Sequence, residues 1–192
     1  MKIESIFGPV QGSLNDFERA FTEVLHSDIP LANQVVNYIA GLKGKRLRPA
    51  LVFLASQLHG ERNPDSMRAA IVVELLHTAT LVHDDVVDSS DLRRGKPTVN
   101  SIWDNRVSVL VGDLLFSRTL TALLNLNSPA ALAIISEAAN RITEGELMQV
   151  EHEHDYNVSE PVYFDLVAKK TAALFSACCE LGALAMGDNA ET

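Results

Sequence analysis

Apolar residues recur at intervals of three and four along nearly the whole sequence, a spacing that places them on one face of a helix. Leu14, Phe17 and Phe21 begin one such run, behind Ser13 as a possible helix cap. Segments such as LVFLASQL could be strands by composition, but no Asn-Gly or Asp-Gly dipeptide is present to connect strands as hairpins. We therefore expect an all-α fold, with helices near 14–27, 31–42, 49–58, 65–91, 107–126, 129–154 and 161–187.

The length and punctuation of the chain predict one domain over residues 1–192. Hydrophobic residues make up 47% of the 192 residues, enough for a compact core, and no repeat, low-complexity tract or linker interrupts them. Loops are expected around 59–64, 92–105 and 155–160. Helix starts are marked where a capping residue stands at or just before a proline, at Asn63-Pro64, Ser128-Pro129 and Ser159-Glu160-Pro161.

The overall charge argues against two classes of partner. A formal net charge of −9 would repel nucleic acid and anionic lipid, so an anionic substrate would need local positive charge or a metal. No stretch approaches 18 uncharged apolar residues, and the first residues lack the features of a signal peptide. The neighbouring Cys178 and Cys179 lie in an apolar helical stretch, as buried thiols do. We expect a soluble cytoplasmic protein without a transmembrane segment.

Four aspartates end the long apolar helix expected at 65–91: Asp84, Asp85, Asp88 and Asp91. If that helix continues to its predicted end, Asp84, Asp88 and Asp91 share one face, and His77 lies two turns earlier on the same face. Each like-charge pair costs about 0.2–0.5 kcal/mol, so a cation should compensate. Carboxylates without nearby cysteines suit Mg²⁺, which binds one or two of them while water and phosphate oxygens complete its shell. A solvated acidic helix end is the alternative.

Basic residues cluster in three places. Arginine forks match phosphate oxygens and lysine adds a point charge, so two clusters beside a metal could hold two diphosphates. Each cluster alone could equally complement a helix end or face water. The clusters are Gly44-Lys45-Arg46-Leu47-Arg48-Pro49, Arg93-Arg94 and Lys169-Lys170-Thr171.

These motifs together resemble the trans-isoprenyl diphosphate synthases, specifically the long-chain, octaprenyl-type enzymes that make quinone side chains. The resemblance runs from about residue 30 to the end of the chain, in the family's order, through GKRLRP, HTATLVHDDVVDSSDLRRGKPT, VGDLLFSRT, EGELMQ and KKTAALF. It implies an isoprenoid synthase helical bundle around a central cavity, Mg²⁺ as cofactor and a homodimer. It also implies that isopentenyl diphosphate condenses with an allylic diphosphate, such as farnesyl diphosphate, to give a long all-trans polyprenyl diphosphate.

The resemblance also implies a role for individual residues. Those expected to bind isopentenyl diphosphate are Lys45, Arg48, His77 and Arg94, and those expected to bind the allylic diphosphate are Arg93, Lys170 and Thr171. Asp84 and Asp88 would ligate Mg²⁺, supported by Asp85 and Asp91, and Gln149 would line the same cavity. The growing chain would pass the small residues Ala79 and Thr80, which predicts a long product limited deeper by Leu123 or Ile135.

The family mechanism is ionisation of the allylic diphosphate, attack by the isopentenyl double bond and loss of a proton. Such synthases carry a second aspartate-rich motif well downstream, and this chain stops at Thr192 before reaching one. The resemblance therefore implies a bundle incomplete at its C-terminus, and we expect the 192 residues to be inactive alone.

Three other functions remain open. A di-metal carboxylate bundle would use the Glu-x-x-His pairs Glu74/His77 and Glu151/His154, but would leave the aspartates and arginines unexplained. A terpene cyclase would share the fold but would not need GKRLRP for a second diphosphate. A non-catalytic subunit of a heteromeric synthase would explain the missing second motif, but need not keep the full aspartate and arginine set.

Overall fold

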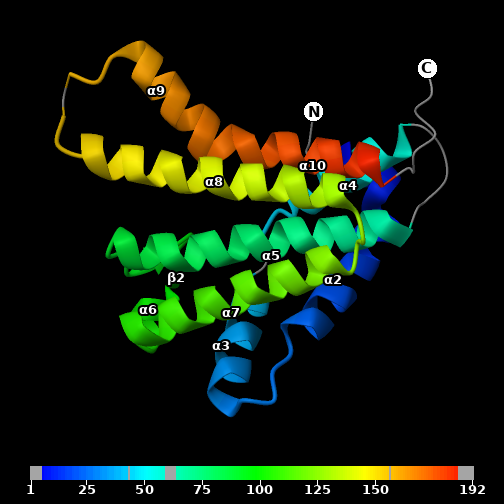
Figure 1. Cartoon of the computed structure of the whole chain (residues 1–192). Helices are drawn as coiled ribbons and strands as arrows, with labels where there is room; N and C mark the ends of the chain where they lie inside the picture. The colour runs from blue at the N-terminus through cyan, green and yellow to red at the C-terminus, as the bar shows by residue number, and fades with distance from the viewer. Residues whose placement is uncertain (1–5, 43, 59–63, 156, 186–192) are drawn as a thin grey trace.

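The structure is a computed structural model and describes residues 6–42, 44–58, 64–155 and 157–185. Within these residues it is a bundle of helices, which confirms the predicted all-α fold (Figure 1). A 3-10 turn, η1 (Gly8–Val10), precedes the first labelled helix, and a π-helical turn, η2 (Ala168–Ala172), joins the last two. The helices are α2 (Gln11–Leu25), α3 (Pro30–Gly41), α4 (Leu47–Gln57), α5 (Pro64–Val87), α6 (Val99–Ile102), α7 (Asn105–Leu124), α8 (Pro129–His152), α9 (Glu160–Val167) and α10 (Ala173–Leu184).

Helix α5 is the central helix of the bundle. It packs along α7 and also against α2, α4 and α10, so every residue from Ala69 to Leu76 is buried (Figure 1). Burial on several sides explains why every residue of that stretch except Glu74 is apolar. The rigid core therefore holds the C-terminal end of α5, where the aspartates lie.

The helix boundaries agree with the sequence prediction in part. Ser128 caps α8, since its Oγ accepts a hydrogen bond from Ala131 N at 3.2 Å. Ser13 does not cap α2, which begins earlier at Gln11 and buries Ser13 inside the helix. Ser159 precedes α9 without a capping hydrogen bond. Asn63 lies outside the described residues.

The predicted helix 65–91 ends four residues early, at Val87. The backbone N–H of Asp88 still donates to Asp84 O at 2.8 Å, so these two aspartates keep helical spacing. Asp91 lies beyond the helix, and its predicted place on the same helical face is therefore wrong.

The predicted loop 92–105 contains a small hairpin and the short helix α6. Strand β1 (Leu92–Arg93) pairs antiparallel with β2 (Lys96–Pro97), and Arg93 lies opposite Lys96. The turn between them places Arg94 at φ 53° and Gly95 at φ 75°, both in the left-handed region that two-residue hairpin turns require. The hairpin folds the two arginines back toward α5.

Helix α7 is, within the described residues, long and apolar enough to cross a membrane, with a mean hydropathy of 1.6. A core helix of a soluble protein passes the same test, and α7 packs along α5 over its length. This apolar stretch contains the charged residues Asp113 and Arg118, so it is not the run of 18 uncharged residues that the sequence was said to lack. The exposed side of α7 nonetheless carries several large apolar residues: Val109, Leu110, Phe116, Leu120 and Leu124.

The two cysteines have different environments. Cys178 is buried and its Sγ–H donates to Leu174 O at 2.9 Å, and burial raises the pKa of its thiol to about 12. Cys179 is exposed. The prediction of buried thiols is therefore correct for Cys178 and wrong for Cys179.

Candidate functional site

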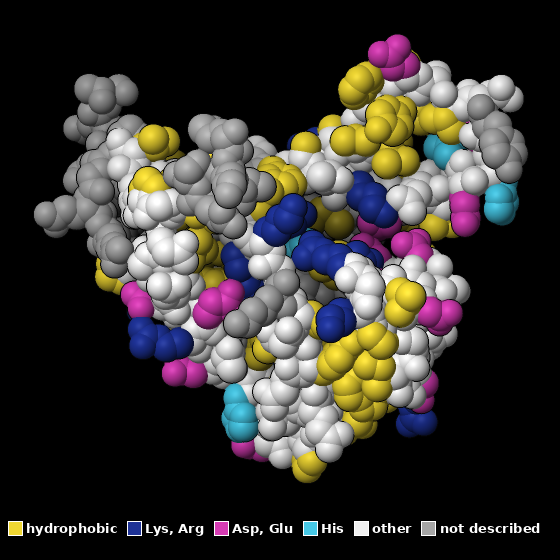
Figure 2. Space-filling view, turned by 180° about the vertical axis from the view of Figure 1, so that it is seen from behind, with side chains coloured by type: hydrophobic (Ala, Val, Ile, Leu, Met, Phe, Trp, Pro, Cys, Tyr) yellow, Lys and Arg dark blue, Asp and Glu magenta, His cyan; other side chains and the backbone are white. Residues whose placement is uncertain are grey.

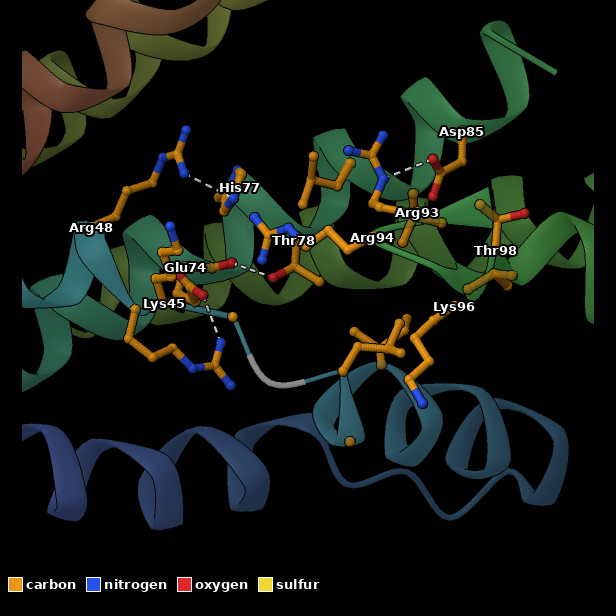
Figure 3. A pocket seen from close by; sticks show the side chains of 18 of the residues that line it. Lys45, Arg48, Glu74, His77, Thr78, Asp85, Arg93, Arg94, Lys96 and Thr98 are labelled. Atoms are coloured by element: carbon orange, nitrogen blue, oxygen red, sulfur yellow. Dashed lines mark hydrogen bonds and ion pairs between the residues drawn. The ribbon is translucent and has the colours of Figure 1, made fainter. Parts of the chain in front are cut away.

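A cavity of about 520 Å³ opens between residues 44–48, the C-terminal half of α5 and the β1–β2 hairpin (Figure 3). It brings together the basic clusters at residues 44–49 and 93–94, which are far apart in the sequence. Figure 2 shows Lys and Arg side chains gathered around a recess on this face, with acidic side chains beside them. The basic residues that line the cavity are Lys45, Arg46, Arg48, Arg93, Arg94 and Lys96, and its lining carboxylates are Glu74 and Asp85.

Both carboxylates in the cavity already have arginine partners. Arg46 Nη1 lies 2.6 Å from Glu74 Oε1, and Arg93 Nε lies 2.8 Å from Asp85 Oδ1. The other four basic residues make no ion pair with a carboxylate in the described part of the chain: Lys45, Arg48, Arg94 and Lys96. The cavity therefore has an excess of positive charge suited to a polyanion such as a diphosphate.

His77 is held neutral at the centre of this charge. Burial, together with the positive charges of Arg48 and Arg94, lowers the pKa of His77 to about 3. Arg48 Nη1 lies 2.9 Å from His77 Nε2, and because a guanidinium only donates, Nε2 accepts and Nδ1 carries the proton. His77 therefore supplies a neutral N–H donor.

Arg48 is oriented from the opposite side by α10. Its guanidinium carbon lies 4.9 Å from the centre of the Phe175 ring, within the range of a cation–π contact. Its buried Nε has no hydrogen-bond partner among the described residues. A buried unpaired donor costs free energy, so the position of Arg48 is maintained by its contacts with His77 and Phe175 rather than by a hydrogen bond of Nε.

A second cluster joins α8 to η2. Lys170 Nζ donates to Glu146 Oε2 at 2.7 Å and to Gln149 Oε1 at 2.6 Å, while the neighbouring Thr171 is exposed. The family motifs predict Lys170 and Gln149 in one site, and the structure adds Glu146, which lies three residues before Gln149 on the same helical face.

Asp84 on α5 faces this second cluster. Burial and the negative charge of Glu146 raise the pKa of Asp84 to about 6, although the positive charges of Lys170 and Arg93 act in the opposite direction. These mutual electrostatic effects place the end of α5 beside the contact between α8 and η2. Asp84 and Lys170 are therefore close enough to interact electrostatically.

A close backbone contact sets the position of η2 against α8. A Cβ atom at Gly145 would lie only 2.6 Å from Lys170 N and 2.9 Å from Lys170 Cα, so no larger residue fits without movement. The π-helical turn is an irregularity of the kind often found at functional sites. Gly145 therefore allows the backbone of Lys170 to lie directly on α8.

The aspartates offer an incomplete but suitable metal site. Asp85 is bound to Arg93, whereas Asp84 and Asp88 lie one helical turn apart and their carboxylates have no hydrogen bond or ion pair within the described residues. Two such carboxylates fit Mg²⁺, which takes its other ligands from water and phosphate. In the same residues no three His, Cys, Asp or Glu side chains gather as a metal site.

The Glu-x-x-His pairs of the di-metal alternative do not come together. Glu74 is bound to Arg46, His77 faces Arg48, and His154 is exposed. The part of the chain that the structure describes therefore gives no support to a ferritin-like centre.

The residues expected to limit chain length are inside the protein but do not line the cavity described above. Ala79, Leu123 and Ile135 are buried members of the hydrophobic core. Thr80 is half-buried and its hydroxyl donates to His77 O at 2.9 Å. The tunnel past these residues stays a prediction.

Comparisons with known proteins agree with this geometry. The octaprenyl diphosphate synthase of Escherichia coli (strain K12) is 38% identical over 187 residues, which are 97% of this chain and 58% of that protein. Component 2 of the heptaprenyl diphosphate synthase of Bacillus subtilis is 32% identical, over 97% of this chain and 54% of that one.

Solved structures agree with the fold as well. The polyprenyl synthase of Caulobacter crescentus CB15, complexed with calcium and isoprenyl diphosphate, is 39% identical with a TM-score of 0.92, covering 97% of this chain and 57% of that one. The chain thus spans a little over half the length of these relatives. The family model for polyprenyl synthetases matches residues 29–192. This match, the relatives and the shared fold show that the chain belongs to the polyprenyl synthetase family.

Proposed function

We propose that this chain is part of a trans-prenyltransferase that condenses isopentenyl diphosphate with an allylic diphosphate to make a long-chain all-trans polyprenyl diphosphate. The observation that carries the proposal is the cavity lined by four basic residues that have no carboxylate partner among the described residues, with the neutral His77 beside Arg48. The carboxylates of Asp84 and Asp88, which have no partner within the described ranges, add a place for a cation at the end of α5. The names of the octaprenyl and heptaprenyl relatives support the long product, which would serve as a quinone side chain.

The cavity is assigned to isopentenyl diphosphate. Lys45, Arg48 and Arg94 would hold its phosphate oxygens, and the Nδ1–H of His77 would donate a further hydrogen bond. The second cluster, between α8 and η2, is assigned to the allylic diphosphate, which Arg93, Lys170 and Thr171 would contact. Lys170 already points its ammonium group toward Glu146 and Gln149, and the anion would share or replace these contacts.

Mg²⁺ is the proposed cofactor, with Asp84 and Asp88 as ligands and Asp85 and Asp91 as supporting residues. The Caulobacter crescentus relative, whose structure contains calcium and isoprenyl diphosphate, supports a divalent cation as cofactor. When bound, the ion would stabilise the negative charge that builds on the departing diphosphate. Asp85 would contribute indirectly by fixing Arg93 through its 2.8 Å ion pair.

The residues of this chain would promote the reaction by position and charge. The guanidinium group of Arg93, which its ion pair with Asp85 already holds in place, would meet charge as it forms on the leaving diphosphate. The buried run of α5 keeps water away from the carbocation. No side chain is needed as a strong base, because the leaving diphosphate can accept the proton.

The resemblance implies two aspartate-rich motifs, and this chain contains one. We infer that prenyl transfer needs further carboxylates opposite Asp84, so that the 192 residues bind isopentenyl diphosphate but do not turn it over alone. Detectable prenyl transfer by the purified 192-residue chain would contradict this inference.

We also propose a single-domain, cytoplasmic homodimer. The exposed apolar side of α7, with Leu110, Phe116 and Leu124, offers a helix face that a second copy could cover. The Bacillus subtilis relative is named as one component of a synthase, so a different partner chain is the alternative. Sedimentation of the purified protein distinguishes the homodimer from a pair with a different chain. A dimer is expected, and a monomer that pairs only after another gene product is added would exclude the homodimer.

Calorimetric titration of the 192-residue chain with isopentenyl diphosphate tests the proposal. We expect saturable binding, and Arg48→Gln should weaken it by at least about 10-fold because a charge-assisted bond is lost. Arg68→Gln is the matched control, since Arg68 is exposed, does not line the cavity and pairs with Asp65 on its own helix. Absence of binding by the folded wild-type chain would refute the assignment of the cavity.

A further inference from the structure

Arg46 stands between the two residues assigned to isopentenyl diphosphate, Lys45 and Arg48, but it has a different environment. Its side chain is 12% exposed and fully engaged with protein groups. Nε and Nη2 lie 2.6 and 3.1 Å from the two carboxylate oxygens of Glu18, and Nη1 lies 2.6 Å from Glu74 Oε1. Arg46 therefore connects α2, α5 and the segment that carries Lys45 and Arg48.

The guanidinium plane is also packed on aromatic rings of α2. Its central carbon lies 5.7 Å from the centre of the Phe17 ring and 5.2 Å from that of Phe21. Although burial opposes it, the hydrogen bonds and charges of Glu18 and Glu74 raise the pKa of Arg46 above its ordinary value. The backbone of Arg46 is left-handed, with φ 49°, a conformation that costs a non-glycine residue free energy and persists where side-chain contacts hold it.

Arg46 is also the cation that pairs with the carboxylate of Glu74. The side chain of Glu74 is 8% exposed and lines the same cavity as Arg48. Without Arg46, Glu74 would be a buried carboxylate without a cation, and Arg48 is a neighbouring cation that could neutralise it. Arg46 thus occupies Glu74 and leaves Arg48 available for a ligand.

We propose that Arg46 and Glu18 are positioning residues, and that helix α2 is thereby part of the isopentenyl diphosphate site. The Glu18–Arg46 pair fixes the segment that carries Lys45 and Arg48, while the Arg46–Glu74 pair keeps Arg48 free. Helix α2 lies outside residues 29–192, which the family model matches. The proposal rests on the proposed function for the identity of the ligand.

The first test compares Glu18→Gln with Glu23→Gln in calorimetric titrations with isopentenyl diphosphate. Glu18 is half-exposed, so its neutralisation leaves the fold intact and should weaken binding by about 3- to 10-fold. Glu23 is an exposed residue of the same helix, and its substitution should leave the affinity unchanged. Equal affinities in the two variants would overturn the role of Glu18.

The second test is a double-mutant cycle between Arg46→Met and Glu74→Gln. Arg46→Met should weaken binding by about 30-fold or more, because the unpaired Glu74 captures Arg48. Adding Glu74→Gln removes that carboxylate and should restore at least about 5-fold of the loss. A double variant that binds no better than Arg46→Met would show that Arg46 acts through packing alone.

A ligand-free measurement separates this proposal from the proposed function. Amide hydrogen exchange of residues 44–48 reports the order of the segment directly, and Glu18→Gln should accelerate it relative to Glu23→Gln. If wild-type protein fails to bind isopentenyl diphosphate, the proposed function fails. If exchange in residues 44–48 is the same in both variants, the positioning role fails.

Discussion

Substitution of Gly145 by alanine tests the contact that positions Lys170. A Cβ atom there would lie 2.6 Å from Lys170 N, whereas ordinary van der Waals contact begins near 3.4 Å, so α8 and η2 must separate by about 0.8 Å. The two nearest atoms, Lys170 N and Lys170 Cα, both belong to the backbone, so the separation must displace backbone rather than a flexible side-chain end. Overpacking of this kind costs about 1–3 kcal/mol, which the better helix propensity of alanine offsets by about 1 kcal/mol.

The functional loss should exceed the loss of stability. A misplacement of about 1 Å in a substrate-positioning group can lower the rate by about 100-fold, so Gly145→Ala should lower kcat/KM for the allylic diphosphate by about 10- to 100-fold. The affinity for isopentenyl diphosphate should change less, because neither Gly145 nor Lys170 lines the cavity of Lys45 and Arg48.

The assay is steady-state kinetics with the full product of the native gene, together with thermal unfolding. Gly8→Ala is the matched control, since a Cβ atom at Gly8 would meet nothing within 4 Å and Gly8 does not line the cavity. If Gly145→Ala is folded and retains the wild-type kcat/KM, the close contact does not position Lys170 and the reasoning is refuted.

Three further predictions follow from buried or unpaired groups. Ala79→Phe should shorten the product, as chromatography of the prenyl chains would show, and an unchanged length would contradict the tunnel past Ala79. Because burial lowers the pKa of His77 to about 3, the folded chain keeps it neutral at pH 5 while the unfolded chain protonates it. The free energy of unfolding should therefore fall between pH 7 and pH 5 by on the order of 2 kcal/mol more in the wild type than in His77→Gln. Urea unfolding at the two pH values measures this, and an equal fall in both proteins would exclude the neutral His77. Asp88→Asn should lower Mg²⁺-dependent turnover at least about 100-fold, while the same change at the exposed Asp28 should not, and similar rates in both variants would remove Asp88 from the metal site.

The sequence predicted the helices well because burial imposes the three-and-four spacing directly. It failed where backbone geometry departs from a regular helix without a sequence mark. The hairpin at 92–97 was missed because its turn uses Arg94-Gly95 rather than Asn-Gly or Asp-Gly, with an arginine in a left-handed conformation. The π-helical turn at Ala168–Ala172 has no composition that distinguishes it from the helices on either side.

The same limit applies to the candidate site. Basic residues near Asp84 could be identified from the sequence, but Arg46 could not be told apart from Lys45 and Arg48. The difference lies in Glu18, which is 28 residues away in the chain and meets Arg46 only in the folded protein. Asp91 was grouped with Asp84 because a continuous helix was assumed, and the early end of α5 at Val87 removes that relation.

The most direct test of the central claim is a prenyl-transfer assay with labelled isopentenyl diphosphate, farnesyl diphosphate and Mg²⁺, with product length measured by chromatography. The 192-residue chain and the full product of its native gene are assayed side by side. We predict a long-chain polyprenyl diphosphate from the full gene product and none from the 192 residues alone. Absence of product from the full gene product would contradict the account and would favour a non-catalytic subunit of a heteromeric synthase.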